Sequence, residues 1–328
     1  MACKHDVTVF TTDPSEKLKK DEMINGVIVR RFKVFAPGDA YYISFSMLEA
    51  LIKSRYDIVH GHNFHALPLF FSQFSHFRKY IVTTHYHGHG STPFRDLLFK
   101  LYKPLGKRIL KAADTIVSVS EYESRLLRQD FKIDSAKTIV IPNGVNWNEF
   151  QGFHKKRDKG KSIMFYVSRL ENYKGIQFAI RALPLLNDKI HLEIVGSGSY
   201  KHELIQLSEQ LRVSHRVHFY QNLERQILIE KFFNADLVLL LSKYEGYGTV
   251  VAEALASGTP CIVTKTSALT QWIDNKNCFG IEYPVEIEKL AALINNVIGK
   301  TVEGVNLLDW DDIASQLELL YLIDSVSF

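Results

Sequence analysis

Short apolar runs alternate with stretches of helical periodicity along most of the chain. In the first half, the apolar runs lie at Asp6–Thr11, Val27–Phe32, Ile58–His62, Tyr80–Thr84, Thr115–Val119 and Thr138–Ile141. The helical patterns stand between them, near Ser46–Lys53, Pro93–Ala112 and Glu121–Gln129. Strands that alternate with helices form parallel sheets covered by helices. The first half is therefore predicted to be an α/β domain.

A second series of the same kind follows a polar segment. The segment Gln151–Lys161 is rich in lysine and arginine and contains two glycines, which predicts a solvated linker. Further apolar runs lie at Ile163–Val167, His191–Val195, Val217–Tyr220, Leu237–Leu241 and Cys261–Val263. Helical patterns stand near Gly175–Leu186, Tyr200–Leu211, Gln226–Phe233, Val250–Ser257 and Asp309–Ile323. We therefore predict a first domain at 1–150, a second at 151–308, and a terminal helix within 309–328.

Composition narrows the class of protein. A length of 328 residues is enough for two ordinary domains, and 46% hydrophobic residues are enough for their cores. The net charge of +4 is too small to indicate nucleic-acid binding. The three cysteines, Cys3, Cys261 and Cys278, show no paired spacing, which favours a reducing, cytoplasmic compartment. No apolar run approaches the ~20 residues that span a bilayer.

The most informative stretch runs from Glu245 to Gly258. An apolar strand precedes it, a turn with Gly246 and Gly248 follows, and a helix of small residues begins near Thr249. Such a turn directs backbone N–H groups and a helix N-terminus toward a phosphate. A glutamate before the helix can reach sugar hydroxyls. A second glutamate one turn inside it, Glu253, can reach a ribose.

This stretch resembles the E-x7-E motif of family 4 retaining glycosyltransferases, which have the GT-B fold. Four other segments resemble motifs of that family in the same order: Asp57–His62, Val82–His85, Ile141–Val145 and Ser168–Gly175. The resemblance implies an α/β protein of two Rossmann-like domains that face each other across a cleft. It also implies a terminal helix that crosses back to the first domain.

The resemblance assigns a donor site to the second domain. Arg169 and Lys174 would hold the diphosphate, Glu253 the ribose, and Glu245 the transferred sugar. The backbone of Gly246, Gly248, Thr249 and Gly196 would line the nucleotide. Simpler interpretations remain open: a solvated basic turn for the two cations, a helix-terminal charge for Glu245, and ordinary turns for the glycines.

Two sets of histidines lie near predicted strand ends. They are His60, His62 and His65, and then His85, His87 and His89. A spacing of two places side chains on one face of an extended segment, so a metal site is one interpretation. The resemblance instead makes His85 the contact to the transferred sugar or acceptor, with His87 as the alternative. It makes His60, His62 and His87 acceptor-side residues.

No metal or cofactor is expected beyond the nucleoside-diphosphate sugar, which is the donor substrate. The triplet Asp309-Trp310-Asp311 looks like a D-x-D metal motif, but it precedes a helix and is predicted to cap it. The segment 94–111 is basic and amphipathic and contains Pro104, which would kink or divide a helix. It would contact anionic lipid peripherally, at the inner face of the membrane, or would simply pack on the sheet.

The opening of the chain departs from the family pattern. In the family, a strand, a glycine-rich loop and a helix precede the segment that here reads His5–Phe10. We therefore expect an N-terminally incomplete first domain, with an interrupted sheet between the Asp6–Thr11 and Ile58–His62 strands. A misplaced start codon and a decayed gene explain this equally well.

The expected function is that of a retaining hexosyltransferase. It would move a hexosyl group from a nucleoside-diphosphate sugar to a lipid-linked, glycan or small-molecule acceptor. One alternative is a catalytically impaired sugar-nucleotide-binding remnant or partner subunit. Another is a histidine-rich metal-binding protein.

Overall fold

The structure is a computed structural model that describes residues 4–35, 42–64, 66–88, 93–155 and 160–322. The chain forms two units. One comprises Met1–Pro142 with Asp311–Phe328, and the other comprises Asn143–Trp310. The chain thus passes between the units twice. At the boundary of the second unit, Val145 forms an isolated parallel bridge with Asp309, and the Val145 N–H donates to Leu308 O at 2.9 Å.

The second unit is built on a six-stranded parallel sheet in the order β10-β9-β8-β11-β12-β13. Its strands are β8 Ser162–Val167, β9 Ile190–Val195, β10 Val217–Tyr220, β11 Leu237–Leu240, β12 Cys261–Thr264 and β13 Cys278–Ile281. The chain runs outward from β8 to one edge, returns to β11, and runs outward to the other edge. The order therefore reverses between β8 and β11. Ligands of open α/β sheets bind at the carboxyl ends of strands at such a reversal.

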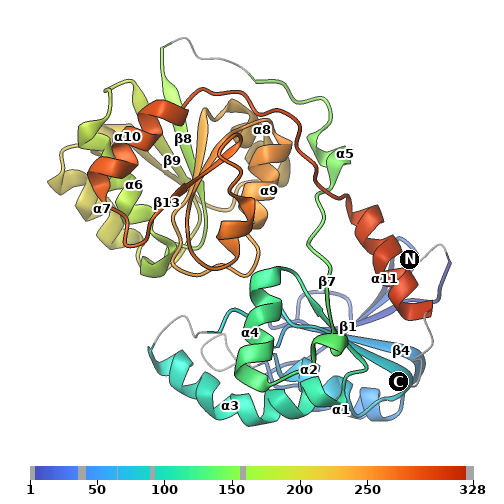
Figure 1. Cartoon of the computed structure of the whole chain (residues 1–328). Helices are drawn as coiled ribbons and strands as arrows, with labels where there is room; N and C mark the ends of the chain where they lie inside the picture. Colours follow the sequence, from blue (N-terminus) through green and yellow to red (C-terminus); the bar gives the residue numbers. More distant parts are fainter. Residues whose placement is uncertain (1–3, 36–41, 65, 89–92, 156–159, 323–328) are drawn as a thin grey trace. The chain divides into compact units, whose positions relative to one another are not determined.

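Helices cover both faces of this sheet: α6, α7 and α10 on one side and α8 and α9 on the other (Figure 1). The helices of this unit are α5 Trp147–Phe150, α6 Ile176–Ala182, α7 Lys201–Gln210, α8 Arg225–Asn234, α9 Thr249–Ala256 and α10 Ile287–Val297. The core lies between the layers, where the rings of Phe165 and Phe232 meet edge to face with centroids 5.1 Å apart.

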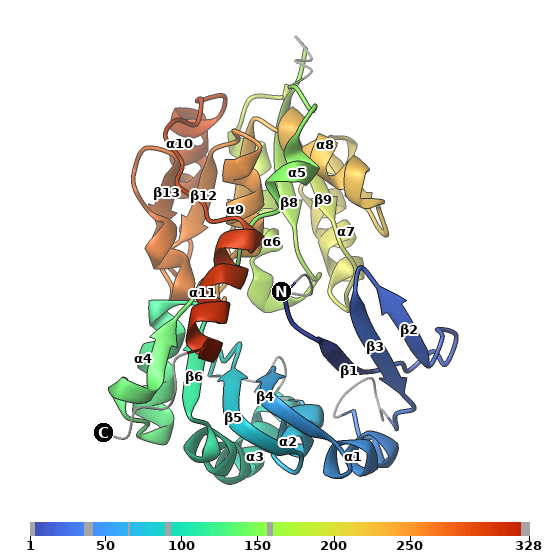
Figure 2. The ribbon, with the colours of Figure 1, turned by 90° about the vertical axis from the view of Figure 1, so that its right-hand side faces the viewer.

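The first unit contains two separate sheets among its described residues (Figure 2). The larger is parallel, with strands β4 Arg55–His62, β5 His76–Thr83, β6 Thr115–Ser118 and β7 Thr138–Val140. The smaller has the order β1-β3-β2, with strands β1 Thr8–Thr12, β2 Asp21–Ile24 and β3 Val27–Phe32. The interruption falls between β1 and β4, where the sequence led us to expect it.

Helices and aromatic side chains fill the first unit. Its helices are α1 Phe45–Ile52, α2 Leu67–Ser72, α3 Pro93–Ala112, α4 Glu121–Phe131 and α11 Trp310–Leu322. The ring of Phe64 contacts those of Tyr86, Phe99, Tyr102 and Phe131. Phe32 of the smaller sheet shares a separate buried cluster with Met47, Leu51 and Phe71. Short 3-10 turns in the chain are η2 Ser135–Lys137, η3 Asn172–Lys174, η4 Leu183–Leu185, η5 Ser214–Arg216 and η6 Ser267–Trp272.

Helices α3 and α11 are the two longest helices among the described residues. Helix α3 continues through Pro104, so of the two expectations for this proline, a kink or a division, the division is wrong. Helix α11 is tied to its unit by Glu318, whose carboxylate meets Lys4 Nζ at 2.9 Å and His5 Nε2 at 2.8 Å. Lys79 Nζ also donates to Leu320 O at 2.5 Å. Among the described helices, none is long and apolar enough to cross a bilayer.

Candidate functional site

Lys174 lies in a tight turn between β8 and α6, at the carboxyl end of β8. The turn ends at Gly175, which has a φ of +77° and begins α6. A Cβ atom on Gly175 would lie 2.1 Å from Leu241 O, so only glycine allows this turn to pack against the end of β11. The Tyr166 hydroxyl donates to Lys174 O at 2.5 Å and accepts the Leu241 N–H at 2.7 Å. Lys174 is thus fixed at the reversal of strand order.

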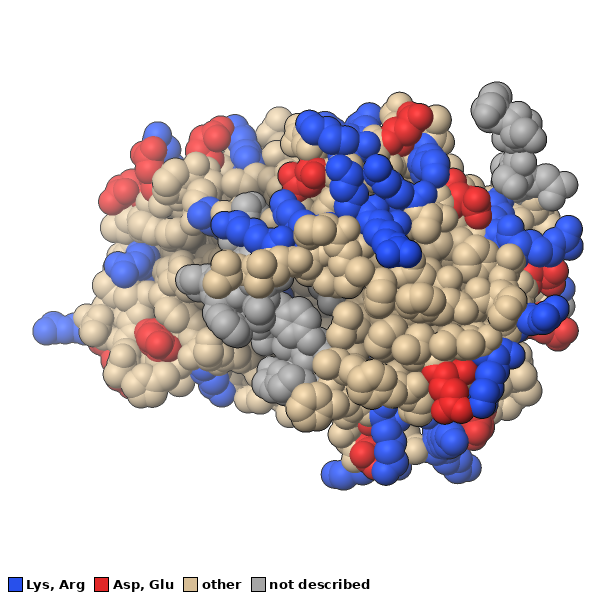
Figure 3. All heavy atoms as spheres, turned by 90° about the horizontal axis from the view of Figure 1, so that it is seen from below, with Lys and Arg blue, Asp and Glu red and all other residues tan. Residues whose placement is uncertain are grey.

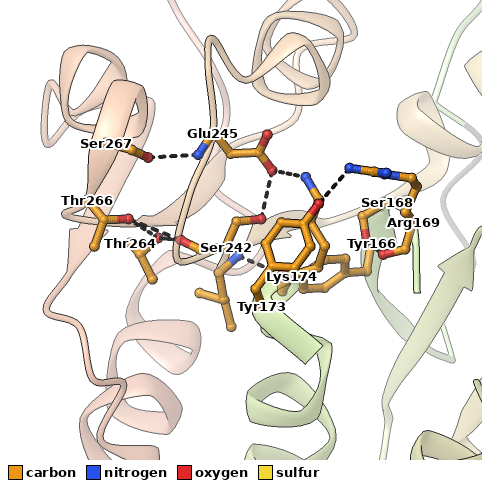
Figure 4. Close-up of polar contacts among 11 residues, drawn as sticks. Tyr166, Ser168, Arg169, Tyr173, Lys174, Ser242, Glu245, Thr264, Thr266 and Ser267 are labelled. Atoms are coloured by element: carbon orange, nitrogen blue, oxygen red, sulfur yellow. Dashed lines mark hydrogen bonds and ion pairs between the residues drawn. The ribbon is translucent and has the colours of Figure 1, made fainter. Parts of the chain in front are cut away.

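Glu245 stands opposite Lys174, in the loop after β11. Lys174 Nζ lies 2.5 Å from Glu245 Oε1, which also accepts the Ser242 hydroxyl at 2.7 Å (Figure 4). The Glu245 N–H donates to Ser267 Oγ at 2.9 Å. Only 12% of the Lys174 side chain and 16% of the Glu245 side chain are exposed, so the ion pair is poorly hydrated. A largely buried pair with further hydrogen bonds holds both groups in one geometry.

Arg169 belongs to the same turn but is exposed. Its Nη2 donates to the Tyr173 hydroxyl at 2.6 Å, next to Lys174 (Figure 4). The structure therefore brings Arg169, Lys174 and Glu245 together. Sequence reasoning had placed the lysine on a diphosphate and the glutamate on a sugar, and had not foreseen that they pair with each other.

The glycine loop leads from Glu245 into α9. Gly248 has a φ of +96° and stands directly before α9, whose first residue is Thr249. Tyr247 is held on two sides: its carbonyl accepts the Trp272 indole N–H at 2.6 Å, and its hydroxyl donates to Asn143 O at 3.0 Å. A Cβ on Gly246 would meet no atom within 4 Å, so the loop is open at that residue. This arrangement suits an anion at the helix N-terminus.

Gly196 and Gly198 line the neighbouring strand end, after β9. Cβ atoms there would lie 1.9 Å from Ser168 O and 2.3 Å from Leu170 O. The Leu170 N–H donates to Ser197 O at 2.8 Å. Both glycines therefore permit the loop after β9 to lie against the Arg169 turn, whether or not a ligand is bound.

Glu253 lies one turn into α9 and contacts a residue that the sequence did not single out. Arg225 Nη1 lies 2.6 Å from Glu253 Oε1, and Arg225 Nε lies 2.8 Å from Glu149 Oε2. Burial raises the pKa of Glu253, and the charge of Arg225 opposes that shift. One signal was available: Arg225 begins α8, where a positive charge is unfavourable with respect to the helix dipole.

In the first unit, three of the histidines form a stack. The ring centroids of His60 and His62 are 4.3 Å apart, and those of His62 and His85 are 6.2 Å apart. His60 Nδ1 lies 2.6 Å from the Tyr321 hydroxyl of α11, and its Nε2 lies 2.7 Å from Thr83 Oγ1. His87 follows in the same loop as His85. His65 and His89 lie outside the described residues.

The stacked histidines favour the neutral form. Burial, followed by the neighbouring rings, holds the pKa of His60 well below its usual range. Burial also lowers the pKa of His85. His62 is exposed at the surface, but partial desolvation of its ring, followed by the neighbouring His85, lowers its pKa to about 4. Neutral imidazoles can donate and accept hydrogen bonds with hydroxyls. Within the described residues, no group of three or more His, Cys, Asp or Glu is arranged to hold a metal ion.

A buried glutamate of α4 holds the turn that carries His85. His85 has a φ of +49°, in the left-handed region. On either side of it, the Thr84 hydroxyl and the Tyr86 N–H donate to Glu123 Oε1. The Val119 N–H donates to Glu123 Oε2 at 2.7 Å. The sequence shows Ser120 and Glu123 as a helix capping box, which hides this second role. Burial raises the pKa of Glu123 to about 7.

Two family models match the chain. "Glycosyltransferase Family 4" matches residues 2–149, and "Glycosyl transferases group 1" matches residues 148–303. A glycogen synthase of Mycobacterium tuberculosis is 25% identical over 98% of this chain and 87% of its own length. An alpha-monoglucosyldiacylglycerol synthase of Streptococcus pneumoniae is 26% identical over 90% of this chain and 71% of its own length.

Solved structures show the same architecture. Sucrose-phosphate synthase of Thermosynechococcus elongatus has a TM-score of 0.77 and 22% identity, covering 96% of this chain and 88% of that one. Anabaena HepE in complex with UDP-glucose has a TM-score of 0.72 and 18% identity, covering 90% of this chain and 86% of that one. The chain has the two-domain α/β fold called GT-B.

Proposed function

Because this chain carries the paired family 4 and group 1 domains of a GT-B glycosyltransferase, we propose that it is a retaining hexosyltransferase. It moves a hexosyl group from a nucleoside-diphosphate sugar to a hydroxyl of a lipid-linked, glycan or small-molecule acceptor. The observation that carries the proposal is the Lys174–Glu245 pair at the carboxyl ends of β8 and β11. A cation, a carboxylate and a helix N-terminus meet there, as a sugar diphosphate requires.

The leaving diphosphate needs stabilisation as its charge grows during transfer. Arg169 supplies a planar fork of N–H donors and Lys174 a compact charge. The N-terminus of α9 after Gly248 adds backbone N–H groups and the positive end of the helix dipole. Lys174 then contacts both the diphosphate and Glu245, so the diphosphate and the transferred sugar bind next to each other. The backbone near Gly196 lines the nucleotide.

Glu245 binds hydroxyls of the transferred sugar, and Glu253 binds the ribose. Glu245 Oε1 already accepts Lys174 and Ser242, which suits a hydrogen-bonding role better than that of a free nucleophile. Transfer with retention therefore proceeds on one face of the sugar, and the leaving diphosphate takes the proton of the acceptor hydroxyl. The resemblance to retaining family 4 enzymes supports this mechanism. Neutral His85 serves the sugar or the acceptor, together with His60 and His62, which stack beside it, and His87, two residues further along the chain.

Calorimetry on the full chain tests the donor assignment. The wild type is titrated with UDP, ADP and GDP; UDP is included because HepE, a structural neighbour of this chain, was solved in complex with UDP-glucose. Arg169→Ala should weaken binding of the preferred nucleotide by about 1.5–3 kcal/mol. Arg181→Ala, an exposed arginine of α6, is the control and should bind as the wild type does. Equal affinity in Arg169→Ala would remove Arg169 from the site. Nucleotide binding without sugar transfer would favour the binding-subunit alternative.

A peripheral membrane contact is the second part of the proposal. Along α3, Leu97 is 56% exposed and Leu101 is 71% exposed. The exposed residues fall at helical spacing and form the outer stripe of α3: Leu97, Lys100, Leu101, Pro104, Arg108 and Lys111. Figure 3 looks from the side on which α3 lies in Figure 1, and shows a group of Lys and Arg side chains on this face with some Asp and Glu side chains beside them. Apolar and basic residues together suit an anionic lipid surface.

With this contact, the proposed enzyme would act in the cytoplasm, at the inner face of the membrane, on a lipid-linked acceptor. The name of the pneumococcal relative, which refers to a diacylglycerol, supports such an acceptor. Sedimentation with phosphatidylglycerol vesicles should carry the wild type down, and phosphatidylcholine vesicles should not. A Leu97→Gln/Leu101→Gln variant should stay in solution. Equal behaviour of the two proteins would contradict the contact.

A further inference from the structure

Four polar side chains form a continuous line through the second unit. Asn146 Nδ2 donates to Glu149 Oε1 at 3.1 Å. Glu149 Oε2 meets Arg225 Nε at 2.8 Å, and Arg225 Nη1 meets Glu253 Oε1 at 2.6 Å. The line joins α5, the start of α8 and the second turn of α9. Arg225 is its centre, because its guanidinium holds two carboxylates at different nitrogens.

The arginine fixes only one oxygen of Glu253. The Glu253 side chain is 14% exposed, so its position is restricted by the surrounding helices. Across the residues that the structure describes, Oε1 meets Arg225, and the structure shows no partner on Oε2. A carboxylate with one oxygen fixed presents the other in a defined direction. A pair of adjacent hydroxyls, such as those of a ribose, would find that oxygen already oriented.

The stability of α8 does not explain an arginine at this position. Arg225 is the first residue of the helix, where a positive charge opposes the helix dipole. Glu253 explains it, since a mostly buried carboxylate needs an opposite charge to remain ionised. Glu149 then restrains the arginine from its other side, and Asn146 restrains Glu149.

We propose that Arg225 is a positioning residue that orients Glu253 toward the donor ribose and makes the site prefer ribonucleotides to deoxyribonucleotides. The proposal rests on the proposed function, because it assumes that Glu253 binds the ribose. Arg225 itself acts through Glu253 and not on the diphosphate. Its loss should therefore affect the contribution of the ribose hydroxyls alone.

Calorimetry on the full chain tests this preference. The nucleoside diphosphate that binds most tightly among UDP, ADP and GDP is compared with its 2′-deoxy and 3′-deoxy analogues. In the wild type, at least one analogue should bind about tenfold more weakly, which is the loss of one hydrogen bond to a charged group. Glu253→Gln and Arg225→Gln should both bring this ratio close to one, with little change for the deoxy analogue. Arg225→Lys should keep an intermediate ratio.

A matched control lies in the same helix. Lys231 of α8 pairs with Glu193 at 2.7 Å, away from Glu253, so Lys231→Gln removes an ion pair without touching the line. It should leave the ratio at the wild-type value. A wild-type ratio in Arg225→Gln, or equal weakening of ribo and deoxy ligands, overturns the inference and leaves the proposed function intact. No binding of any nucleotide by the wild type overturns both. Thermal unfolding of each variant verifies that it is folded.

Discussion

Lys174 Nζ and Glu245 Oε1 lie 2.5 Å apart, and this distance joins two motifs that are 71 residues apart in sequence. One motif supplies the cation proposed for the diphosphate, and the other supplies the carboxylate proposed for the sugar. The strands that precede the two residues, β8 and β11, are neighbours in the sheet, so the fold itself brings the two side chains together.

The first prediction concerns the energy of this pair. Lys174→Gln and Glu245→Gln should each lower the free energy of unfolding by about 1–3 kcal/mol, because each leaves a largely buried charge without its partner. The double variant should recover part of the loss, which gives a coupling energy in a double-mutant cycle. Denaturant unfolding measures it.

A surface pair provides the control for that cycle. Lys265 and Glu282 lie 2.8 Å apart but are 44% and 73% exposed, so Lys265→Gln should change stability by less than about 1 kcal/mol. If the effects of Lys174→Gln and Glu245→Gln simply add in the double variant, the two residues do not stabilise each other.

The second prediction concerns metal. In the proposed donor site, Arg169, Lys174 and the N-terminus of α9 would supply the positive charge that a divalent cation provides in other enzymes. A chelator should therefore leave sugar transfer largely unchanged. Loss of activity that manganese restores would contradict this. Stoichiometric zinc in the purified protein, without nucleotide affinity, would instead support the metal-binding alternative for the histidines.

The third prediction concerns pH and Glu123. Burial raises the pKa of this carboxyl to about 7 from 4.5, so the folded protein binds its proton more tightly than the unfolded chain does. The stability that this provides is complete below about pH 4.5 and is lost as the pH rises through 7. Relative to Glu123→Gln, the wild type should lose on the order of 2–3 kcal/mol between pH 4.5 and pH 8.

Denaturant unfolding of both proteins at several pH values measures that difference. The comparison cancels the histidines, which are the same in both chains. A difference that does not change with pH would show that Glu123 has an ordinary pKa. Because Glu123 holds the His85 turn, Glu123→Ala should also lower transferase activity more than Glu123→Gln does.

The fourth prediction concerns the separate sheet of the first unit. Strands β1, β3 and β2 pair among themselves and rest on the small cluster around Phe32 and Met47. The larger sheet packs on the more extensive aromatic core around Phe64. Amide hydrogens of β1 and β3 should therefore exchange faster than those of β5 and β6. Equal protection in hydrogen-exchange mass spectrometry would mean that the two sheets open together.

Local patterns in the sequence were enough to predict the architecture. The apolar runs and the order of the motifs predicted two α/β units with parallel sheets, and each predicted strand overlaps an observed one. Strand β13 was not predicted, because Cys278–Ile281 is short and contains a glycine. Helix α10 was not predicted either, although the helical spacing of its buried residues indicates a helix: Leu290, Ala291, Ile294 and Val297.

The contacts within the candidate site were harder to predict. The Lys174–Glu245 pair depends on β8 lying next to β11, and strand order is not written in local periodicity. Arg225 depends on how α8 lies against α9. Glu123 looks like a capping residue until the His85 turn is seen beside it. In each case the sequence shows the residue type, and only the fold supplies its partner.

The double passage of the chain between the units has a mechanical consequence. The segments next to the crossings at 142–143 and 310–311 are held together where Val145 meets Asp309. A Cβ on Gly144 would lie 2.7 Å from Trp310 N, so the two segments touch closely. A protease that cuts one of them should leave the halves attached through the other.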